Sequence, residues 1–338
     1  MSDKRVTIRD LAKAVGVNPS TVSRALNPST KHLITAEVVE KISKAAEEMG
    51  YFPNRMAAAL VQRRSFTIGM LVPDVTNPVF PPIIRGLEDG LEKAGYTLIT
   101  VNSDNIEEYE KTAFRRLRER AIDGCVMASA HRQDQVVDDC LKQKLPLVLV
   151  NRTTDRQDVN AVINDDEAGI EDALNHLIEL GHKRIMHIAG PQDTSTGFVR
   201  LRKFKSHLKG KKLPSDLVVV ANGFTEKAGY DAMKKMLAKK SDFTAVLAGN
   251  DLLALGCLDA LQEAGMKCPD DISVIGYNDI PMMDRVAPAL TTIAIPQYQI
   301  GQRAAEILLN QLQESGGEIV LARLKPKLIV RDSTRKIT

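Results

Sequence analysis

The stretch TIRDLAKAVGVNPSTVSRALN, residues 7–27, decides the fold of the N-terminal region. Thr7 and Asp10 have the spacing of a capping box, in which each side chain accepts a hydrogen bond from the other residue's backbone N–H. Apolar residues then recur every three or four positions as far as Val15, and Gly16 suits the left-handed turn that ends many helices. The pattern therefore predicts a first short helix.

A second short helix is expected to follow almost at once. Asn18 suits a helix cap and Pro19 suits a first helical position, so a helix is predicted over residues 19–26. Two short helices joined by a glycine-containing turn form a helix-turn-helix, although a helical hairpin in an unrelated bundle would have the same spacing. The expected exposed face carries the short polar and guanidinium side chains that contact base edges and phosphates in the major groove: Ser20, Ser23 and Arg24.

A third amphipathic helix is expected over residues 35–49, which would complete a small three-helix domain. The sequence GYFP, residues 50–53, ends this helix. Residues 54–60 then regain helical propensity for only about two turns, and isolated helices of that length barely form in water. This segment is a candidate hinge that becomes helical when the domain docks on DNA.

Charge is distributed unevenly along the 338 residues. Residues 1–64 contain 11 Lys or Arg and six Asp or Glu, a net charge of +5, whereas the remainder has a net charge of −2. A basic head on a slightly acidic body favours contact between the head and a polyanion, because neutralised phosphates supply most non-specific DNA affinity. Basic segments are more often simply solvated, so charge alone is weak evidence for nucleic-acid binding.

The composition is that of a globular protein with room for two or three domains. Hydrophobic residues make up 43% of the chain and charged residues 26%, and no apolar run approaches the ~20 residues of a transmembrane helix. No secretory signal is recognisable at the N-terminus, so no membrane contact and a cytoplasmic location are expected. The four cysteines are dispersed without a Cys-x-x-Cys pair, which favours buried thiols over a disulfide framework or a zinc site.

From residue 67 onward, short apolar runs typical of strands alternate with amphipathic stretches such as 84–94 and 252–264. Such alternation predicts an α/β region of parallel sheets flanked by helices. Neither G-x-G nor G-K-[ST] occurs, so the fingerprints of dinucleotide and P-loop sites are absent from the sequence. The expected strands are 68–72, 98–101, 124–128, 147–150, 184–188, 217–220, 245–248, 272–275 and 327–330.

Polar and aromatic side chains follow these strands, where a parallel sheet brings them to one edge. Amides and carboxylates suit vicinal hydroxyl groups and an aromatic ring suits the face of a sugar, so the loops predict a polyol site. Plainer roles are open, because Asp74 and Asp279 could shape or cap turns and Phe80 could belong to the core. The candidates are Asp74, Phe80, Asn151, Arg152, Thr194, Thr196, Arg200, Phe224, Asn250, Asp251 and Asp279.

Motifs in one order along nearly the whole chain resemble the lactose-repressor (LacI/GalR) family of bacterial transcription regulators. The helix-turn-helix carries TIRDLA, VGV and STVSRALN, and GYFPN follows at residues 50–54. Further motifs are PDVTNPVF at 73–80, LGHKRI at 180–185, PDDISVIGYND at 269–279, LTTI at 290–293 and VRDST at 330–334.

The resemblance implies an all-α helix-turn-helix headpiece with a hinge helix, followed by a two-lobed core like that of periplasmic sugar-binding proteins. The headpiece would span residues 1–53, the hinge 54–64 and the core 65–338. The N-lobe would comprise about 65–164 and 296–323, and the C-lobe about 165–295 and 324–338. The chain would cross between the lobes near Asn164, Pro296 and Leu324.

The resemblance also implies a homodimer whose headpieces bind a pseudo-palindromic double-stranded operator, with the hinge helices in the minor groove. Pro19, Ser20 and Arg24 would contact bases and Leu60 would insert between base pairs. The family usually has an arginine where Ala58 stands, so fewer phosphate contacts are expected there. No leucine-heptad tail follows residue 330, which favours a dimer over a tetramer. The expected DNA-binding residues are Thr7, Pro19, Ser20, Thr21, Ser23, Arg24, Asn27, Asn54 and Leu60.

The function that the resemblance implies is a sequence-specific DNA-binding regulator, a repressor first of all, controlled by an effector in the cleft between the lobes. The effector would be a sugar, a sugar acid or a sugar phosphate, since Arg152 and Arg200 offer planar forks that suit anions. Family positions favour Arg200, Asp251, Asn151 and Phe224 as ligand contacts.

No enzyme activity, cofactor or metal is expected. His176, His182 and His187 do not have the spacing that aligns metal ligands on one helix face, and neither H-E-x-x-H nor G-x-S-x-G occurs. The alternative from another class is a cytoplasmic sugar-binding protein or sugar enzyme with a vestigial headpiece.

Overall fold

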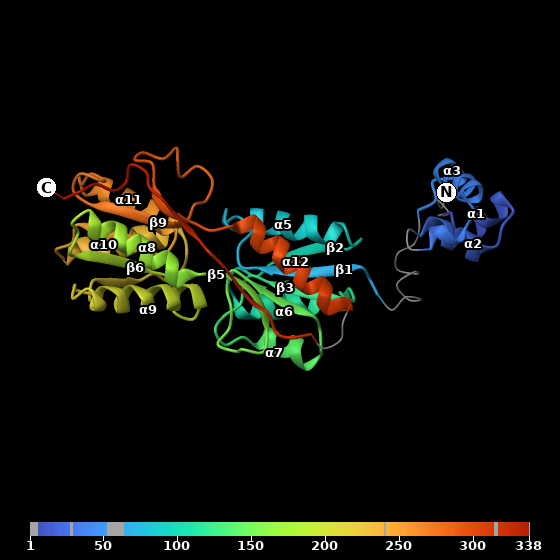
Figure 1. Ribbon diagram of the computed structural model, residues 1–338, viewed down its shortest axis with the longest axis horizontal. Coiled ribbons are helices and arrows are strands. Elements are labelled where there is room, and N and C mark those ends of the chain that lie inside the picture. The colour runs from blue at the N-terminus through green and yellow to red at the C-terminus, as the bar shows by residue number, and fades with distance from the viewer. Residues whose placement is uncertain (1–5, 28–29, 53–63, 240, 314–316, 338) are drawn as a thin grey trace. The chain divides into compact units, whose positions relative to one another are not determined.

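The computed structural model describes residues 6–27, 30–52, 64–239, 241–313 and 317–337. The chain divides between Ser65 and Phe66 into two compact units, the headpiece and the core (Figure 1). The expected hinge helix, with Asn54, Ala58 and Leu60, lies outside the described residues.

The headpiece begins with the helix-turn-helix that residues 7–27 predict. Thr7 and Asp10 form the full capping box, with the Thr7 N–H donating to Asp10 Oδ2 at 2.9 Å and the Asp10 N–H donating to Thr7 Oγ1 at 3.3 Å. Gly16 has a φ of 76°, the left-handed conformation that ends the first helix. Asn18 Oδ1 accepts from the Ser20 N–H at 2.9 Å and caps the second helix. The headpiece elements are α1 (Ile8–Val15), α2 (Pro19–Leu26), the 3-10 helix η1 (Lys31–Leu33) and α3 (Ala36–Glu48).

The three headpiece helices pack around one small apolar core. Leu11 of α1, Val22 of α2 and Ile42 of α3 are fully buried and meet there. Small alanines complete this core at the contacts between helices, which lets short helices approach closely. The third helix is therefore confirmed, with Thr35 preceding its first residue.

The N-lobe is a six-stranded parallel sheet with helices on both faces (Figure 1). Its strand order is β11-β5-β4-β3-β1-β2. Alternate residues of β1 serve the two faces: Met70 packs in the cluster that includes α5 and α12, and Leu71 packs in the cluster that includes α6 and α7. The elements are β1 (Thr67–Val72), α5 (Phe80–Glu92), β2 (Thr97–Asn102), α6 (Glu107–Glu119), β3 (Gly124–Met127), α7 (Gln135–Lys142), β4 (Leu147–Val150), β5 (Asn160–Asn164), α12 (Gln297–Gln313) and β11 (Leu321–Leu324).

The C-lobe repeats this plan with a second six-stranded sheet of order β12-β10-β9-β8-β6-β7. Helices α8 and α9 contact each other and the sheet, as do α10 and α11. The elements are α8 (Asp166–Glu179), β6 (Ile185–Ala189), α9 (Ser195–Gly210), β7 (Val218–Val220), α10 (Glu226–Ala238), β8 (Ala245–Ala248), α11 (Asp251–Glu263), β9 (Ser273–Asn278), β10 (Thr291–Ala294) and β12 (Lys327–Ile329).

Three connections join the two lobes. They lie between β5 and α8 at Asp165, between β10 and α12 at residues 295–296, and between β11 and β12 at residues 325–326. The prediction of parallel sheets is wrong for one pair, because β12 runs antiparallel to β10. The reason is that β10 leads out of the C-lobe whereas β12 carries the chain back into it.

Helices α5 and α12 of the N-lobe cross at two glycines. A Cβ atom on Gly86 would lie 2.1 Å from the Tyr298 carbonyl oxygen, and one on Gly301 would lie 2.0 Å from the Ile83 carbonyl oxygen. Both distances are far shorter than any ordinary contact, so the close approach of the two helix backbones requires residues without a side chain at both positions.

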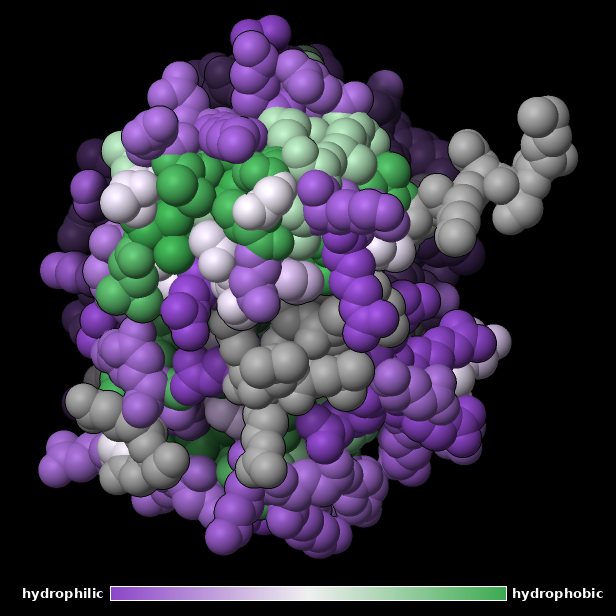
Figure 2. Space-filling model, turned by 90° about the vertical axis from the view of Figure 1, so that its right-hand side faces the viewer, coloured by the Kyte–Doolittle hydropathy of each residue, from purple (hydrophilic) through white to green (hydrophobic). Residues whose placement is uncertain are grey.

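Hydropathy varies over the face of the molecule drawn in Figure 2. Figure 2 shows hydrophilic side chains, in purple, over most of the face turned to the viewer, with apolar side chains, in green, gathered mainly in its upper half. Leu33 and Phe52 are exposed large apolar residues of the headpiece. Among the described helices, none is long and apolar enough to cross a bilayer.

Candidate functional site

The exposed face of α2 is the candidate DNA-contacting surface. Val22 and Ala25 point into the headpiece core, so the helix period leaves Ser20, Ser23 and Arg24 exposed together on the opposite side. Three neighbouring side chains that donate hydrogen bonds can contact base edges and phosphates when such a helix lies in the major groove.

The other predicted DNA-binding residues of the headpiece surround this face. Pro19 and Thr21 are half-buried on α2, and Asn27 is half-buried at its end. Thr7 is exposed at the start of α1, where its hydroxyl donates to Asp10 Oδ2 at 2.6 Å. The DNA contacts of these residues stay predictions.

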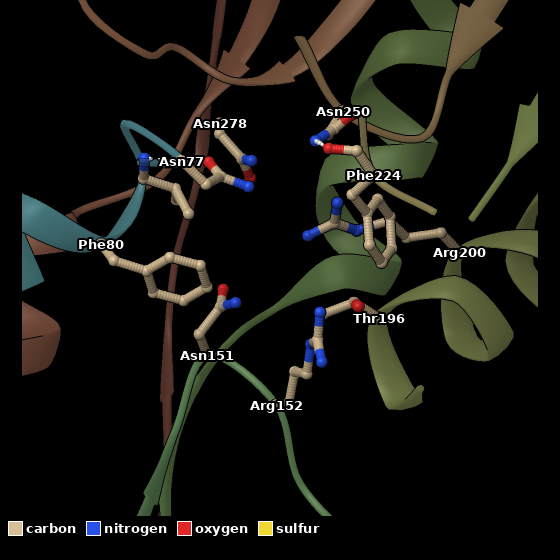
Figure 3. Close-up of a pocket in the computed structure, with 10 residues that line it drawn as sticks. Asn77, Phe80, Asn151, Arg152, Thr196, Arg200, Phe224, Asn250 and Asn278 are labelled. Carbon is tan, nitrogen blue, oxygen red and sulfur yellow. Dashed lines mark hydrogen bonds between the residues drawn. The ribbon is translucent and has the colours of Figure 1, made fainter. Parts of the chain in front are cut away.

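A pocket between the lobes brings together seven of the eleven predicted effector residues (Figure 3). Each lobe supplies half of its lining, from segments at the carboxyl ends of strands, as expected for ligand sites in open α/β sheets. The cavity is only about 20 Å³, room for about one water molecule, so a larger ligand requires the lobes to separate. The lining residues are Asn77, Val79, Phe80, Asn151 and Arg152 of the N-lobe, and Thr196, Arg200, Phe224, Asn250 and Asn278 of the C-lobe.

Arg200 lies in the C-lobe wall and is held on three sides. Its Nε and Nη2 contact Asp166 Oδ1 at 3.0 and 2.9 Å, its Nη1 donates to the Gly249 carbonyl at 2.6 Å, and its guanidinium lies 3.7 Å from the centre of the Tyr277 ring. Burial raises the pKa of Asp166, and the Arg200 charge opposes that shift. Arg200 is therefore a rigid donor whose charge is balanced by the carboxylate beside it.

Arg152 follows β4 in the N-lobe wall and is also buried, with 4% of its surface exposed. Its Nη1 donates to Asn105 Oδ1 at 2.9 Å and to the Ser129 carbonyl at 3.4 Å. Burial lowers the pKa of Arg152 to about 10, still high enough to keep the side chain charged. Among the described residues, no carboxylate forms an ion pair with it.

Amide side chains supply most of the remaining polar lining. Asn151 has a φ of 62°, and its Oδ1 accepts from Asn164 Nδ2 at 3.5 Å. Asn278 has a φ of 116°, and its buried Oδ1 has no hydrogen-bond partner among the described residues. Left-handed backbone and an unmet acceptor at two lining residues are costly features, and such costs concentrate at functional sites.

Two aromatic rings face the pocket, Phe80 from the N-lobe and Phe224 from the C-lobe (Figure 3). Phe80 is 2% exposed and also packs in the apolar core, so both of its proposed roles fit its position. The Phe224 ring lies against Gly190, where a Cβ atom would be 2.3 Å from the ring. Gly190 therefore leaves the space that the Phe224 ring occupies.

The other four predicted effector residues do not line the pocket. Asp74 accepts from the Thr76 N–H at 2.9 Å, which is the turn-forming role left open above. Thr194 caps α9 through the Gly197 N–H, and Asp279 pairs with Arg331 at 2.8 Å.

Asp251, a favoured contact, is fully buried and is not among the residues that line the pocket. Its carboxylate accepts from Thr292 Oγ1 at 2.5 Å and from the Ile280 N–H at 2.9 Å. Burial raises its pKa to about 6. A carboxylate with both oxygens engaged inside the fold ties α11 to the neighbouring strands and does not reach the cavity.

Three lining residues, Asn77, Val79 and Asn278, were not among the predicted candidates. Asn77 and Val79 lie in the same loop as Phe80, so their proximity to a chosen residue was the available signal. Asn278 ends β9, and its neighbour Asp279 was chosen instead. Successive residues of an extended strand point in opposite directions, so an error of one position selects the wrong side chain.

Direct contacts bridge the two lobes beside the pocket. His131 Nδ1 lies 3.1 Å from Asp193 Oδ2, and the Arg132 N–H donates to the Asp193 carbonyl at 2.8 Å. The Thr153 N–H donates to Ser195 Oγ at 2.9 Å. These contacts form only while the lobes are close, so they favour the closed arrangement.

A second pocket of about 550 Å³ lies beside these contacts, between α6, α7 and the loop that carries Asp193. Its charges largely pair with one another, as in Lys111 with Glu107 and Arg132 with Asp155. Val136 is the one apolar residue among those that line it, so this pocket offers less of the mixed polar and apolar wall that small-molecule sites use.

His176, His182 and His187 each contact other parts of the C-lobe. His187 is fully buried with Nδ1 2.7 Å from the Leu247 carbonyl, and burial lowers its pKa to about 4. His176 contacts Thr334, and His182 contacts Thr244 and the Arg335 carbonyl. Within the described residues, no group of three or more His, Cys, Asp or Glu side chains could hold a metal ion.

Comparisons with known proteins agree with both units. Residues 7–54 match the family described as bacterial regulatory proteins, lacI family, and residues 174–334 match the periplasmic binding protein-like domain. The chain is 34% identical over 333 residues to the HTH-type transcriptional repressor CytR of Escherichia coli K12, covering 98% of this chain and 97% of CytR. It is 32% identical over 334 residues to the HTH-type transcriptional repressor PurR of Aliivibrio salmonicida, covering 98% and 99%.

Solved structures agree as well. The lac repressor dimer bound to operator and the anti-inducer ONPF has a TM-score of 0.87 at 27% identity, covering 98% of this chain and 100% of that one. A LacI family transcriptional regulator from Enterococcus faecium with bound ribose has a TM-score of 0.72 at 34% identity, covering 80% and 100%. These relatives are regulators rather than enzymes, and the chain belongs to the lacI family of bacterial regulatory proteins.

Proposed function

We propose that the protein is a transcriptional repressor that binds operator DNA through α2 and is controlled by a small molecule bound between the lobes. The observation that carries this proposal is the presence, in one chain, of an exposed polar α2 face and a pocket lined equally by two lobes. A binding protein needs only the pocket, whereas a regulator needs both. It would act in the bacterial cytoplasm, where operator DNA lies.

The proposed effector is a sugar or a sugar derivative. Amide and guanidinium donors suit hydroxyl groups, and the Phe80 and Phe224 rings suit the apolar face of a sugar. Relatives support this class: the chain is 29% identical to the ribose operon repressor of Halalkalibacterium halodurans, and similar structures contain ribose or cellobiose.

The proposed coupling passes through the N-lobe. A ligand that contacts both walls stabilises one relative orientation of the lobes, because it binds that orientation best. The chain enters the N-lobe at Phe66, whose N–H donates to Asp123 Oδ2 at 2.8 Å and whose ring centre lies 5.4 Å from that of Tyr96. A shift of the N-lobe therefore moves the segment that leads to the headpiece. Such coupling is typically worth ~1–3 kcal/mol and is reciprocal, so DNA must change effector affinity by the same factor.

The proposed active form is a homodimer, as in the lac repressor structure bound to operator. Two headpieces related by a two-fold axis would contact a pseudo-palindromic site, each placing α2 in the major groove of one half-site. The residues proposed to contact DNA are those predicted from the sequence, with Ser20, Ser23 and Arg24 at the centre of the exposed face.

The test selects double-stranded fragments from a random-sequence DNA library with the purified full chain and measures their affinity by fluorescence anisotropy. An Arg24→Ala variant should bind the selected fragments at least about fivefold more weakly, because a guanidinium contact to a base contributes about 1–3 kcal/mol. Lys235→Ala, which removes one exposed positive charge from the C-lobe, is the matched control and should bind normally. Failure to enrich any sequence, or equal affinity of the two variants, would favour a sugar-binding protein with a vestigial headpiece.

A further inference from the structure

We propose that the effector of this pocket is an anionic carbohydrate, whose carboxylate or phosphate group binds the Arg152 guanidinium. This inference rests on the proposed function, because it assigns a chemical class to the same pocket. Its basis is the charge of the pocket walls and the way in which the two buried arginines are paired.

The charged residues that line the pocket all have the same sign. The ten lining residues include two arginines and four asparagines but no aspartate or glutamate. A site for a neutral polyol has no need of excess positive charge, because amide and carboxylate oxygens are the acceptors that hydroxyl groups require. The lining offers amide groups but no carboxylate, and its two arginines give it a net positive charge, which is the pattern expected for a negatively charged ligand that also carries hydroxyl groups.

The two arginines differ in how their charges are balanced. Arg200 has an ion-pair partner at 2.9 Å in Asp166, and both residues are buried. Arg152 has only neutral hydrogen-bond partners among the described residues, Asn105 Oδ1 and the Ser129 carbonyl. A buried guanidinium without a counter-ion is costly, and such a cost is removed when an anion binds.

Two acidic groups, Asp193 and Glu110, act electrostatically on Arg152, but neither forms an ion pair with it. Asp193 and Glu110 each favour its charged form, and the Arg200 charge disfavours it. Burial, followed by the charge of Asp134, raises the pKa of Glu110 to about 7, which weakens the negative charge that this carboxyl can offer near neutral pH. Asp193 already contacts His131.

The geometry of Arg152 leaves a donor edge for a ligand. Both hydrogen bonds from Arg152 to the protein use Nη1, so Nε and Nη2 have no hydrogen-bond partner among the described residues. Figure 3 shows the Arg152 side chain rising from the N-lobe wall toward the C-lobe residues of the pocket. Two parallel N–H donors on one edge of a guanidinium match the two oxygens of a carboxylate or phosphate.

The experiment measures binding of matched neutral and anionic probes to the purified full chain by isothermal titration calorimetry. The pairs are D-glucose with D-glucuronate and D-ribose with D-ribose 5-phosphate, and inorganic phosphate is tested alone. We expect the anionic member of at least one pair to bind at least tenfold more tightly than its neutral partner, with affinity that falls as salt is raised. The pair that responds distinguishes a carboxylate from a phosphate. Equal or tighter binding of the neutral members would overturn the proposal and leave the proposed regulator function intact.

Two variants connect the preference to Arg152. Arg152→Gln should abolish the difference between anionic and neutral probes, whereas Arg156→Gln, an exposed arginine that pairs with Asp138 and Asp158, should keep it. A preference that survives in Arg152→Gln would overturn the assignment.

A measurement without ligand decides the case in which none of these probes binds. Arg152→Gln removes a buried charge that has no counter-ion, so the melting temperature of the free chain should rise by at least about 2 °C. Arg200→Gln leaves Asp166 buried and unpaired, so its melting temperature should fall. A melting temperature that falls or does not change in Arg152→Gln would show that its charge is already balanced within the protein and would overturn the proposal.

Discussion

The crossing of α5 and α12 gives a sharp quantitative prediction for Gly301→Ala. The new Cβ atom would lie 2.0 Å from the Ile83 carbonyl oxygen and 2.6 Å from the Leu87 nitrogen, both backbone atoms that cannot rotate away. Because real Cβ contacts are essentially never under 3.0 Å, the helices must separate by about 1 Å along much of their packed surface. Overpacking of this kind costs about 1–3 kcal/mol or more, and alanine returns at most about 1 kcal/mol of helix propensity.

Because both overlaps are with backbone atoms, we expect a cost at the upper end of this range, and the resulting net loss of about 2 kcal/mol should lower the melting temperature of the core by about 4–8 °C. Thermal and urea unfolding followed by far-UV circular dichroism measure this loss. The matched control is Gly210→Ala at the end of α9, where a Cβ atom meets nothing within 4 Å, so this variant should be as stable as the parent or slightly more stable. Equal stability of Gly301→Ala and the parent would refute the close approach of these two helices.

Three further predictions concern the pocket, a hydrogen bond between the lobes and a buried histidine. Gly190→Ala should displace the Phe224 ring and weaken effector binding at least tenfold, with little loss of stability, because the overlapped atoms belong to a side chain that can rotate. Calorimetry with the identified effector measures the affinity, and a melting curve measures the stability. An unchanged affinity would contradict the role of the ring in binding. Ser195→Ala removes the hydrogen bond from the Thr153 N–H across the cleft, which favours the closed arrangement whose cavity is too small for a sugar, so effector affinity should rise about two- to tenfold. An affinity that falls would mean that this contact also forms in the ligand-bound arrangement. Burial lowers the pKa of His187 from the usual 6.5 to about 4, so His187 is neutral in the folded protein and its contribution to stability is complete above pH 6.5 and declines as the pH falls from 6.5 toward 4. Between pH 7 and pH 5, the free energy of unfolding measured in urea should therefore fall by about 2 kcal/mol more in the parent than in His187→Gln. Parallel pH profiles of the two proteins would contradict this prediction.

The headpiece could be predicted in detail because its signals are local. Thr7 with Asp10, Gly16 and Asn18 with Pro19 each act within four residues of the chain, and all three perform the expected capping roles. Local hydrogen bonds of this kind need no tertiary partner to be recognised in a sequence.

The core was predicted less completely because its weaker strands depend on neighbours. β5, β10 and β11 were not expected, whereas the other nine described strands were; the predicted bounds of β4 and β8 are those observed, and at least one end of each of the other seven is displaced by one to three residues. β11 has the sequence LARL with alternating exposed residues and pairs only with β5, so its strand character comes from the sheet edge that it joins.

The residues that line the pocket could be predicted only in part from the sequence. Residues that follow strands were correctly expected near one edge, but which side chains reach the cavity depends on single-residue direction and on internal partners. The Asp251 carboxylate accepts hydrogen bonds from Thr292 and Ile280 and so does not line the cavity. Asn278, rather than its neighbour Asp279, lines the cavity. These partners come from distant parts of the chain, so no local pattern reveals them.

The most direct test of the central claim measures operator affinity with and without effector. A labelled operator fragment selected by the full chain is titrated by fluorescence anisotropy, first alone and then with a saturating concentration of the molecule identified by calorimetry. We expect operator affinity to change by about 5–150-fold, and effector affinity to change by the same factor when it is measured with and without operator. An effector that binds the pocket yet leaves operator affinity unchanged would contradict coupling between the two units.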